Sequence, residues 1–309
     1  MPRRSRRADP ETIRRRLINL LTNFEAELQS RDLRRKVLAL VPAFHALRDL
    51  GSSLITVGGA DAGRKRILFY FQKYPKVVIQ GDELMVVAGI SDWPRRLREL
   101  RVEFGWAILN GKTIKEMARE GEFSINGIDA MSLGPDHYIL LGTVEDREAA
   151  HRWNIANEIR RKTSSVRDKI LEFLKKNLGK PVTGEELRYV ANDKTEWARR
   201  ARELRTEFGW PIVTKSTGRP DLPVGSYVLE QNRQSPPHDR RIPDPIRTAV
   251  LRRDKYTCRE CDWHHELWNK SDPRHLELHH IKPHSERGEN LPENLRTLCT
   301  VCHDEIHRK

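Results

Sequence analysis

The sequence predicts an α+β protein in which a helical N-terminal region precedes two related helix-rich domains and a small metal-stabilised domain at the C-terminus. Three observations lead to this prediction. Apolar residues recur with helical spacing near the N-terminus, a fourteen-residue segment occurs twice, and all four cysteines lie in two C-x-x-C pairs near the C-terminus. We expect five segments, with bounds at residues 1–62, 63–144, 145–230, 231–244 and 245–309.

The chain is strongly basic and contains no long apolar run. Its 309 residues include 57 Lys and Arg against 44 Asp and Glu, a formal net charge of +13. Such an excess favours a polyanionic partner such as nucleic acid. No apolar run approaches the length of a membrane span, and residues 2–7 are rich in arginine, unlike a signal segment. We therefore expect a soluble cytoplasmic protein without a membrane partner.

Residues 9–50 are expected to form two amphipathic helices, the second starting at Ser30 and ending at Gly51. The apolar residues expected to face inward on the second helix are Leu33, Val37, Leu40, Val41, Phe44 and Leu47. Two helices cannot bury both of their apolar stripes alone. They pack either on the following domain or on a second copy of the chain, and we favour a homodimer. Residues 51–63 are rich in small residues and are expected to form a linker.

A segment of fourteen residues recurs 104 positions later in the chain. WPRRLRELRVEFGW begins at Trp93 and WARRARELRTEFGW begins at Trp197, and the two differ only at their second, fifth and tenth positions. In both copies two helices precede the repeated helix and a β-hairpin follows it, at residues 106–109 with 137–141 and at residues 210–213 with 225–229. This order predicts two winged-helix domains in tandem, the winged helix being a form of the helix-turn-helix.

In a winged-helix domain the third helix enters the major groove of DNA. The candidates for DNA contacts are the tryptophan that opens each repeated helix and the arginines on its exposed face: Trp93, Arg95, Arg96, Arg98, Arg101, Trp197, Arg199, Arg200, Arg202 and Arg205. Arginine can bind phosphate and can also read guanine bidentately. The alternative is that the arginines form a solvated face paired with Glu99 and Glu203, and that the tryptophans cap the core. We expect about half of these arginines to contact DNA, mostly at phosphates.

The four cysteines predict a structural zinc site. Cys258 and Cys261 form one pair, Cys299 and Cys302 form the other, and 37 residues separate the pairs. This spacing is typical of a four-cysteine zinc site. Disulfides would require an oxidising compartment, which the N-terminal residues do not suggest. We expect one structural Zn²⁺ that stabilises a segment too poor in apolar residues to hold its shape alone.

The histidines of the same segment predict a second metal site. His303 and His307 are four residues apart and would share one face of a helix. His279 could supply a third ligand from the strand-like run LELHHI, whereas its neighbour His280 would point to the opposite face and stay free to act as a base. Three histidine ligands leave one coordination position open, as a catalytic ion requires. The alternative is a zinc-finger-like helix with no open position.

The motifs LHHIKP, ENLRTLC and VCHDEIHRK resemble the HNH nucleases of the ββα-metal type, many of which carry a four-cysteine zinc. The resemblance covers residues 245–309 and implies a β-hairpin and a helix around one divalent ion. It also implies that His280 is the general base, that Asn294 holds the loop orienting His280, and that the metal ligands are His279, His303 and His307. Many zinc-stapled relatives carry Asp where this chain has His279. Of the candidate ions, imidazole ligands favour Zn²⁺, Ni²⁺, Co²⁺ or Mn²⁺ over Mg²⁺.

The whole arrangement resembles a restriction-type endonuclease, in which the winged helices read double-stranded DNA and the HNH module cuts it. The pattern W-x-R-R-x-R-E-L-R resembles winged helices fused to nucleases that recognise methylated DNA, particularly N6-methyladenine. Two other functions remain open: an HNH homing endonuclease of a mobile element, and a DNA-binding regulator with an inactive nuclease fold. The presence of His280, Asn294 and all three candidate ligands disfavours the regulator. A single metal site cuts one strand, so a double-strand break would need two protomers.

Overall fold

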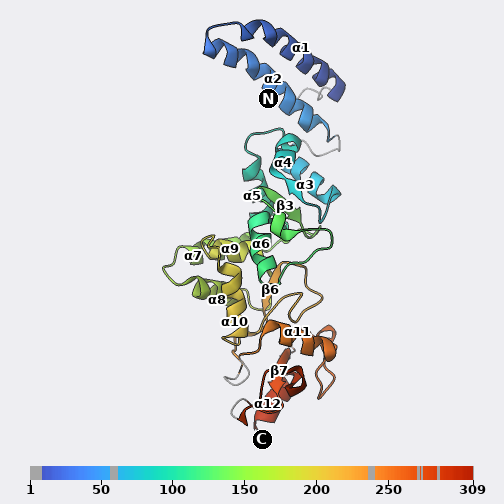
Figure 1. Cartoon of the computed structure of the whole chain (residues 1–309), viewed down its shortest axis with the longest axis vertical. Helices are drawn as coiled ribbons and strands as arrows, with labels where there is room; N and C mark the ends of the chain where they lie inside the picture. Colours follow the sequence, from blue (N-terminus) through green and yellow to red (C-terminus); the bar gives the residue numbers. More distant parts are fainter. Residues whose placement is uncertain are drawn as a thin grey trace. The chain divides into compact units, whose positions relative to one another are not determined.

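The computed structural model describes residues 9–55, 62–235, 241–269, 272, 274–283 and 286–308, so the arginine-rich residues 2–7 lie outside it. The chain folds into two compact units. Unit 1 comprises Met1–Ile108 and Asp136–Ala149, and unit 2 comprises Leu109–Pro135 and Ala150–Lys309. Figure 1 labels most of their helices and several of their strands. None of the described helices is long and apolar enough to cross a membrane.

Unit 1 begins with two helices, α1 (Pro10–Leu28) and α2 (Leu33–Ser53), which pack side by side (Figure 1). Each helix starts after an aspartate whose carboxylate accepts a backbone N–H of the first turn. Asp9 accepts from the N–H of Thr12 at 3.0 Å, and Asp32 accepts from the N–H of Arg34 at 2.9 Å. The second helix therefore starts later than the expected Ser30. It also continues past Gly51 into the expected linker, of which residues 56–61 lie outside the described part of the chain.

The apolar stripe that was expected to face inward on α2 is exposed. Ala43 and Ala46 are buried instead, and the exposed residues are Leu33, Val37, Leu40, Val41, Phe44 and Leu47. Within one chain α2 therefore buries small side chains, and the predicted stripe does not face the interior; its packing on a second copy stays a prediction. At its C-terminal end α2 is tied to the rest of unit 1 by Arg48, which donates to the carbonyl of Gly89 at 3.2 Å.

The first repeat consists of helices packed on a small antiparallel sheet. Leu97 and Leu100 of the repeated helix enter its core beside Phe71, Leu84 and Trp106, so that Arg95 and Arg98 remain exposed. The sheet has the strand order β1-β3-β2. In chain order the elements are α3 (Gly63–Lys73), β1 (Ile79–Gln80), α4 (Gly81–Ala88), α5 (Trp93–Val102), β2 (Ile108–Asn110) and β3 (His137–Leu140).

The second repeat, in unit 2, has the same order of elements and the equivalent strand order β4-β6-β5. Ile79 pairs with Tyr138 in the first repeat, and Val182 pairs with Tyr227 in the second. Both expected hairpins are therefore present, and each gains a short third strand. After the preceding helix α7 (Ala149–Arg160), the elements are α8 (Val166–Lys176), β4 (Val182–Thr183), α9 (Gly184–Val190), α10 (Trp197–Thr206), β5 (Ile212–Val213) and β6 (Ser226–Leu229).

The first hairpin differs from the second because it contains an additional helix. Between β2 and β3 lie α6 (Gly111–Arg119) and a 3-10 turn at Ala130–Ser132. They belong to Leu109–Pro135, which is part of unit 2, so the expected bounds 63–144 do not enclose one compact unit. Helix α6 packs against α9 and α10, and the hydroxyl of Thr113 donates to Glu185 at 2.8 Å. The sequence predicted only a simple hairpin here, formed by residues 106–109 and 137–141.

The C-terminal part of unit 2 is a hairpin of two strands followed by a helix. It consists of α11 (Asp244–Arg253), β7 (Leu276–His280), β8 (Leu295–Cys299) and α12 (Thr300–Arg308). Strands β7 and β8 are antiparallel, with His280 opposite Leu295. Leu251 of α11 packs on Leu278 and Leu295, which anchors the hairpin. Short 3-10 turns lie at His265–Leu267 and at Pro292–Asn294.

The segment expected as a tether, residues 231–244, is packed in its described part. Ser235 donates its backbone N–H to the carbonyl of Gly209 at 2.7 Å, Arg233 forms an ion pair with Asp304, and Ile242 is buried. Residues 236–240, which include two of the prolines that suggested a tether, lie outside the described residues. The α11–β7–β8–α12 region is therefore attached to the second repeat by several contacts.

Candidate metal centres and active site

The four cysteines converge on one point. Cys258 and Cys261 lie in the turn after α11, Cys299 ends β8 and Cys302 lies in α12. Their sulfur atoms all lie within 4.8 Å of one another, and those of Cys261 and Cys299 are 3.7 Å apart. A tetrahedral zinc with Zn–S bonds of about 2.3 Å would separate its sulfur ligands by about 3.8 Å. The cluster therefore has the size and the donor set of a structural zinc site.

The surroundings of the cysteine cluster are rigid and largely apolar. The backbone N–H of Cys258 donates to the carbonyl of Trp263 at 2.8 Å, and the indole of Trp263 donates to Asp272 at 3.0 Å. Burial raises the pKa of the Cys299 thiol to about 11 and raises that of Cys302 further. Thiolates in such a place need a compensating cation, which a bound zinc ion would supply.

Three histidines form a second cluster. His279 comes from β7, and His303 and His307 come from consecutive turns of α12. One ring nitrogen from each lies within 4.8 Å of the others, and the Nε2 atoms of His303 and His307 are 3.1 Å apart. Imidazole nitrogens brought this close fit a shared divalent cation, and without a cation the same distance fits an N–H···N hydrogen bond. His279 and His303 are buried, and His307 is exposed.

Glu277, which the sequence analysis did not select, orients one of these histidines. Its Oε2 lies 2.6 Å from Nδ1 of His303, and both side chains are buried. When Nδ1 of His303 carries a proton and donates it to this carboxylate, Nε2 of His303 is unprotonated, and its lone pair faces His307. The alternation of side chains along β7 places Glu277 on the same face as His279. That spacing was the available signal for this residue.

His280 points to the opposite face of β7 and meets Asn290. Nε2 of His280 lies 2.8 Å from Oδ1 of Asn290, and Nδ2 of Asn290 donates to the backbone carbonyl of Arg241 at 2.7 Å. Because a carbonyl can only accept, the amide group of Asn290 must keep its NH₂ there and turn its oxygen to His280. His280 then carries its proton on Nε2, which leaves Nδ1 as the basic nitrogen. Asn290 was not among the residues predicted from the sequence.

Asn294 closes the loop between β7 and β8. Its Oδ1 accepts the backbone N–H of Lys282 at 2.9 Å, and its Nδ2 donates to the carbonyls of Lys282 and Glu289 at 3.1 and 2.9 Å. The backbone carbonyl of Asn294 also accepts from the N–H of Ile281 at 2.9 Å. One side chain thus holds both ends of the loop that follows His280.

The candidate DNA contacts divide into exposed and buried residues. Arg95, Arg98 and Arg199 are exposed, and Arg96, Arg101, Arg200 and Arg202 are partly buried. Trp93 is also partly buried. The prediction was wrong for Trp197 and Arg205, which are 0% and 2% exposed, because both side chains are packed within unit 2. Glu99 and Glu203 each pair with two arginines of their own helix, as the alternative interpretation expected.

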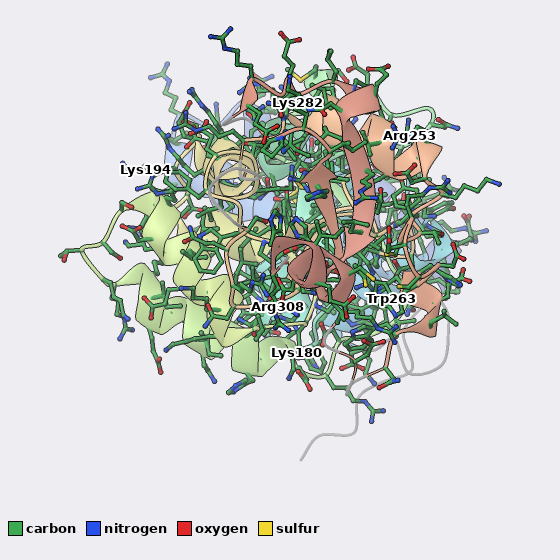
Figure 2. All side chains as sticks on the ribbon, turned by 90° about the horizontal axis from the view of Figure 1, so that it is seen from below. Lys180, Lys194, Arg253, Trp263, Lys282 and Arg308 are labelled. Atoms are coloured by element: carbon green, nitrogen blue, oxygen red, sulfur yellow. The ribbon has the colours of Figure 1, made fainter. Side chains whose placement is uncertain are left out.

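Basic side chains also surround the C-terminal hairpin. Figure 2 shows Arg253, Lys282 and Arg308 around this end of the chain. Lys282 and Arg308 are exposed. Arg253 forms an ion pair with Asp254, in which its Nε lies 2.9 Å from Oδ1 of the carboxylate. Such a surface is suited to a phosphate backbone.

Comparison with known families agrees with this geometry. Residues 258–309 match the HNH endonuclease family. The C-terminal segment is an HNH endonuclease domain. The KpnI N-terminal domain family, which is named for a restriction enzyme, matches residues 64–141 and 167–230. These two stretches coincide with the two repeats. No curated protein and no solved structure is significantly similar to the chain.

The two matches together support a DNA endonuclease of the restriction type. The predicted HNH domain is confirmed, and so is the convergence of the four cysteines. The ions, the roles of the histidines and the DNA contacts are not tested by these matches and remain predictions.

Substituting Cys302→Ser is expected to remove about one equivalent of zinc per chain and to unfold the HNH domain, because structural zinc carries much of the folding free energy of such small domains. Elemental analysis of purified protein and thermal denaturation measure both effects. The neighbouring exposed substitution Val301→Ser is the control and should change neither. A Cys302→Ser protein with unchanged zinc content would contradict the assignment.

Substituting Glu277→Gln is expected to weaken divalent-metal binding at the three histidines by roughly 10- to 100-fold, because the amide cannot share the proton of His303 as a carboxylate does. Titration calorimetry with Mn²⁺, Co²⁺ or Ni²⁺ measures the affinity. Glu305→Gln, an exposed change on the same helix α12, should leave the affinity unaltered. The zinc content at the cysteines should be unaltered in both variants. Equal affinities for Glu277→Gln and the parent protein would refute the role.

Proposed function

We propose that this protein is a restriction-type endonuclease that hydrolyses phosphodiester bonds in double-stranded DNA. One observation carries the proposal. His279 and His280 lie on opposite faces of β7, so that the first joins His303 and His307 while the second is held by Asn290. The arrangement separates a metal-binding face from a base, which is the division that metal-assisted hydrolysis requires.

The donor set fits a divalent cation bound by His279, His303 and His307, and imidazole ligands favour Mn²⁺, Co²⁺, Ni²⁺ or Zn²⁺ over Mg²⁺. When bound, such an ion acts as a Lewis acid for charge on the scissile phosphate and the departing 3′ oxygen. Nδ1 of His280 accepts a proton from water as its oxygen forms a bond to phosphorus. The bond from phosphorus to the 3′ oxygen breaks, and that oxygen is protonated. Asn294 and Asn290 position His280 for this step.

The duplicated domains would read the DNA as winged helices. Their order of helix, strand, two helices and two strands supports this interpretation, as does the net charge of +13. We extend the proposal to adenine methylation, on the resemblance of the W-x-R-R-x-R-E-L-R pattern to winged helices of nucleases that act on N6-methyladenine. We also propose a homodimer. Each chain has one HNH domain, and the exposed apolar residues of α2 offer a surface for a second copy.

The test is cleavage of one plasmid, prepared with and without adenine methylation, in the presence of Mg²⁺, Mn²⁺, Co²⁺, Ni²⁺ or Zn²⁺. We expect cleavage of the methylated form at discrete sites, with the imidazole-preferring ions most active. Equal cleavage of both plasmid forms would refute the methylation requirement and would still support the endonuclease activity. The control is His280→Ala, which should bind DNA and not cut it, because the base is lost. Retained cutting by this variant would contradict the role of His280 as the base. No cutting by the parent protein with any ion would favour a DNA-binding regulator.

Substituting Asn290→Ala is expected to lower kcat for cleavage by roughly 10- to 100-fold with little change in KM, because His280 would no longer be held in one tautomer. Asn290→Asp keeps an oxygen against Nε2 of His280 and should retain more activity than Asn290→Ala. Initial rates measured over a range of DNA concentrations separate the two parameters. Metal content should be unchanged in both variants, and a parallel loss of metal would show that Asn290 acts on folding instead.

A further inference from the structure

The two copies of the repeated helix have nearly identical sequences but different surroundings. Trp93 of α5 is partly exposed and meets Tyr138 of its own domain edge-on, at 6.1 Å between ring centroids. Its counterpart in α10, Trp197, is completely buried, and its indole donates a hydrogen bond to the carboxylate of Glu116 in α6. The difference therefore lies in what covers each helix.

The arginines of the two helices differ in the same direction. Arg98 of α5 is exposed, and it makes no ion pair within the described parts of the chain. Its counterpart Arg202 forms an ion pair with Glu120 at 2.7 Å. Two helices of nearly identical sequence thus present a solvent-facing guanidinium in one copy and a guanidinium paired with a carboxylate in the other.

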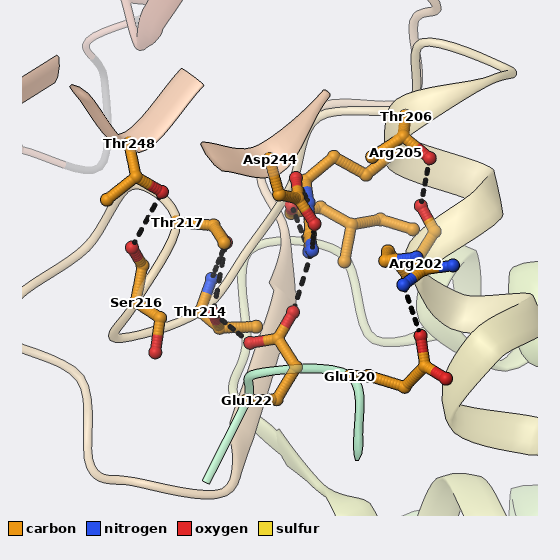
Figure 3. A network of polar contacts seen from close by, with 11 residues as sticks. Glu120, Glu122, Arg202, Arg205, Thr206, Thr214, Ser216, Thr217, Asp244 and Thr248 are labelled. Atoms are coloured by element: carbon orange, nitrogen blue, oxygen red, sulfur yellow. Dashed lines mark hydrogen bonds and ion pairs between the residues drawn. The ribbon is translucent and has the colours of Figure 1, made fainter. Parts of the chain in front are cut away.

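Arg205, at the end of α10, is buried within a network that Figure 3 shows in detail. Its guanidinium contacts Glu122 at 2.7 Å and Asp244 at 2.8 Å. The other oxygen of Glu122 accepts from the hydroxyl of Thr214 at 2.5 Å. Asp244 is the first residue of α11, so Arg205 joins the second repeat to the helix that packs on β7 and β8 of the HNH domain.

The three glutamates that occupy α10 come from one short stretch of chain. Glu116 lies in α6, and Glu120 and Glu122 follow it, all within the insert Leu109–Pro135 of the first hairpin. A carboxylate beside each of Trp197, Arg202 and Arg205 removes the donors that phosphates or guanines would need. It also places negative charge where a DNA backbone would have to approach.

We propose that the two repeated helices have divided roles: α5 contacts DNA, whereas α10 is a structural helix that holds the insert and the HNH domain together. This inference rests on the proposed function, because it requires that the chain bind DNA. It concerns Arg98 and Arg202 most directly, since these occupy equivalent positions. Arg95 with Arg96 and Arg199 with Arg200 pair with acidic residues in the same way in both copies and do not distinguish them.

The experiment compares Arg98→Gln with Arg202→Gln in the full chain, each combined with His280→Ala so that the DNA stays intact. Fluorescence anisotropy with a cleavable duplex, repeated over a range of salt concentrations, measures affinity and its salt dependence. Arg98→Gln should weaken binding by roughly 5- to 100-fold and reduce the salt slope by about one, with unchanged Tm. Arg202→Gln should change affinity less than about threefold.

Glu120→Gln breaks the same ion pair as Arg202→Gln without altering α10, and it separates lost stability from a lost DNA contact. An equal small loss of binding in both variants would come from the broken ion pair and support the structural role. A loss in Arg202→Gln that matches Arg98→Gln and is absent from Glu120→Gln would overturn the division of roles. If the parent protein fails to bind DNA with salt-dependent affinity, the proposed function itself fails, and this inference fails with it.

Arg205→Ala gives a second readout that does not depend on DNA. If α10 is structural, loss of Arg205 leaves the buried Glu122 and the partly buried Asp244 without this cation, and the Tm should fall by roughly 5 °C or more. Thr206→Ala, on the neighbouring position of the same helix, is the control. An unchanged Tm for Arg205→Ala would overturn the structural role of this helix.

Discussion

Along β7, neighbouring side chains point to opposite faces, and this alternation keeps the two chemical tasks of the site apart. Glu277 and His279 lie on the face that meets α12, where Glu277 contacts His303. Leu278 and His280 lie on the other face, which packs on α11. A slip of one residue would exchange these faces and move the apolar anchor into the metal site. The paired register of β7 with β8, five residues long, is therefore the constraint on which the proposed active site depends.

The duplication gave the chain two copies of one helix, and the structure uses them differently. An insert in the first hairpin brings three glutamates to α10, and helix α11 adds Asp244. A buried guanidinium shared by two carboxylates is costly to separate once it has formed. Contacts of Arg205 with Asp244 and of Arg233 with Asp304 therefore attach the C-terminal region to the second repeat, although the intervening sequence is rich in prolines and suggested a free tether.

The sequence predicted those features that are encoded locally. The C-x-x-C pairs, the spacing of His303 and His307, and the repeated segment are all short patterns, and each led to the element that the structure contains. The failures depend on tertiary contacts. Nothing near Trp197 or Arg205 indicates burial, because the glutamates that cover them lie about 80 residues earlier in the chain. Asn290 was missed for the same reason, since its partner Arg241 is 49 residues away.

Helix α12 carries ligands of both candidate metal centres in adjacent positions, Cys302 for the cysteine cluster and His303 for the histidine cluster. The two centres are thus coupled mechanically, through a single turn of helix. Cys261 is the exposed member of the cysteine cluster and can be reached by small oxidants. Oxidation of the thiols of the cysteine cluster would release the start of α12 and displace His303 and His307 from the histidine cluster. Through these shared residues, an oxidant would inactivate the proposed nuclease without reacting with any residue of its proposed active site.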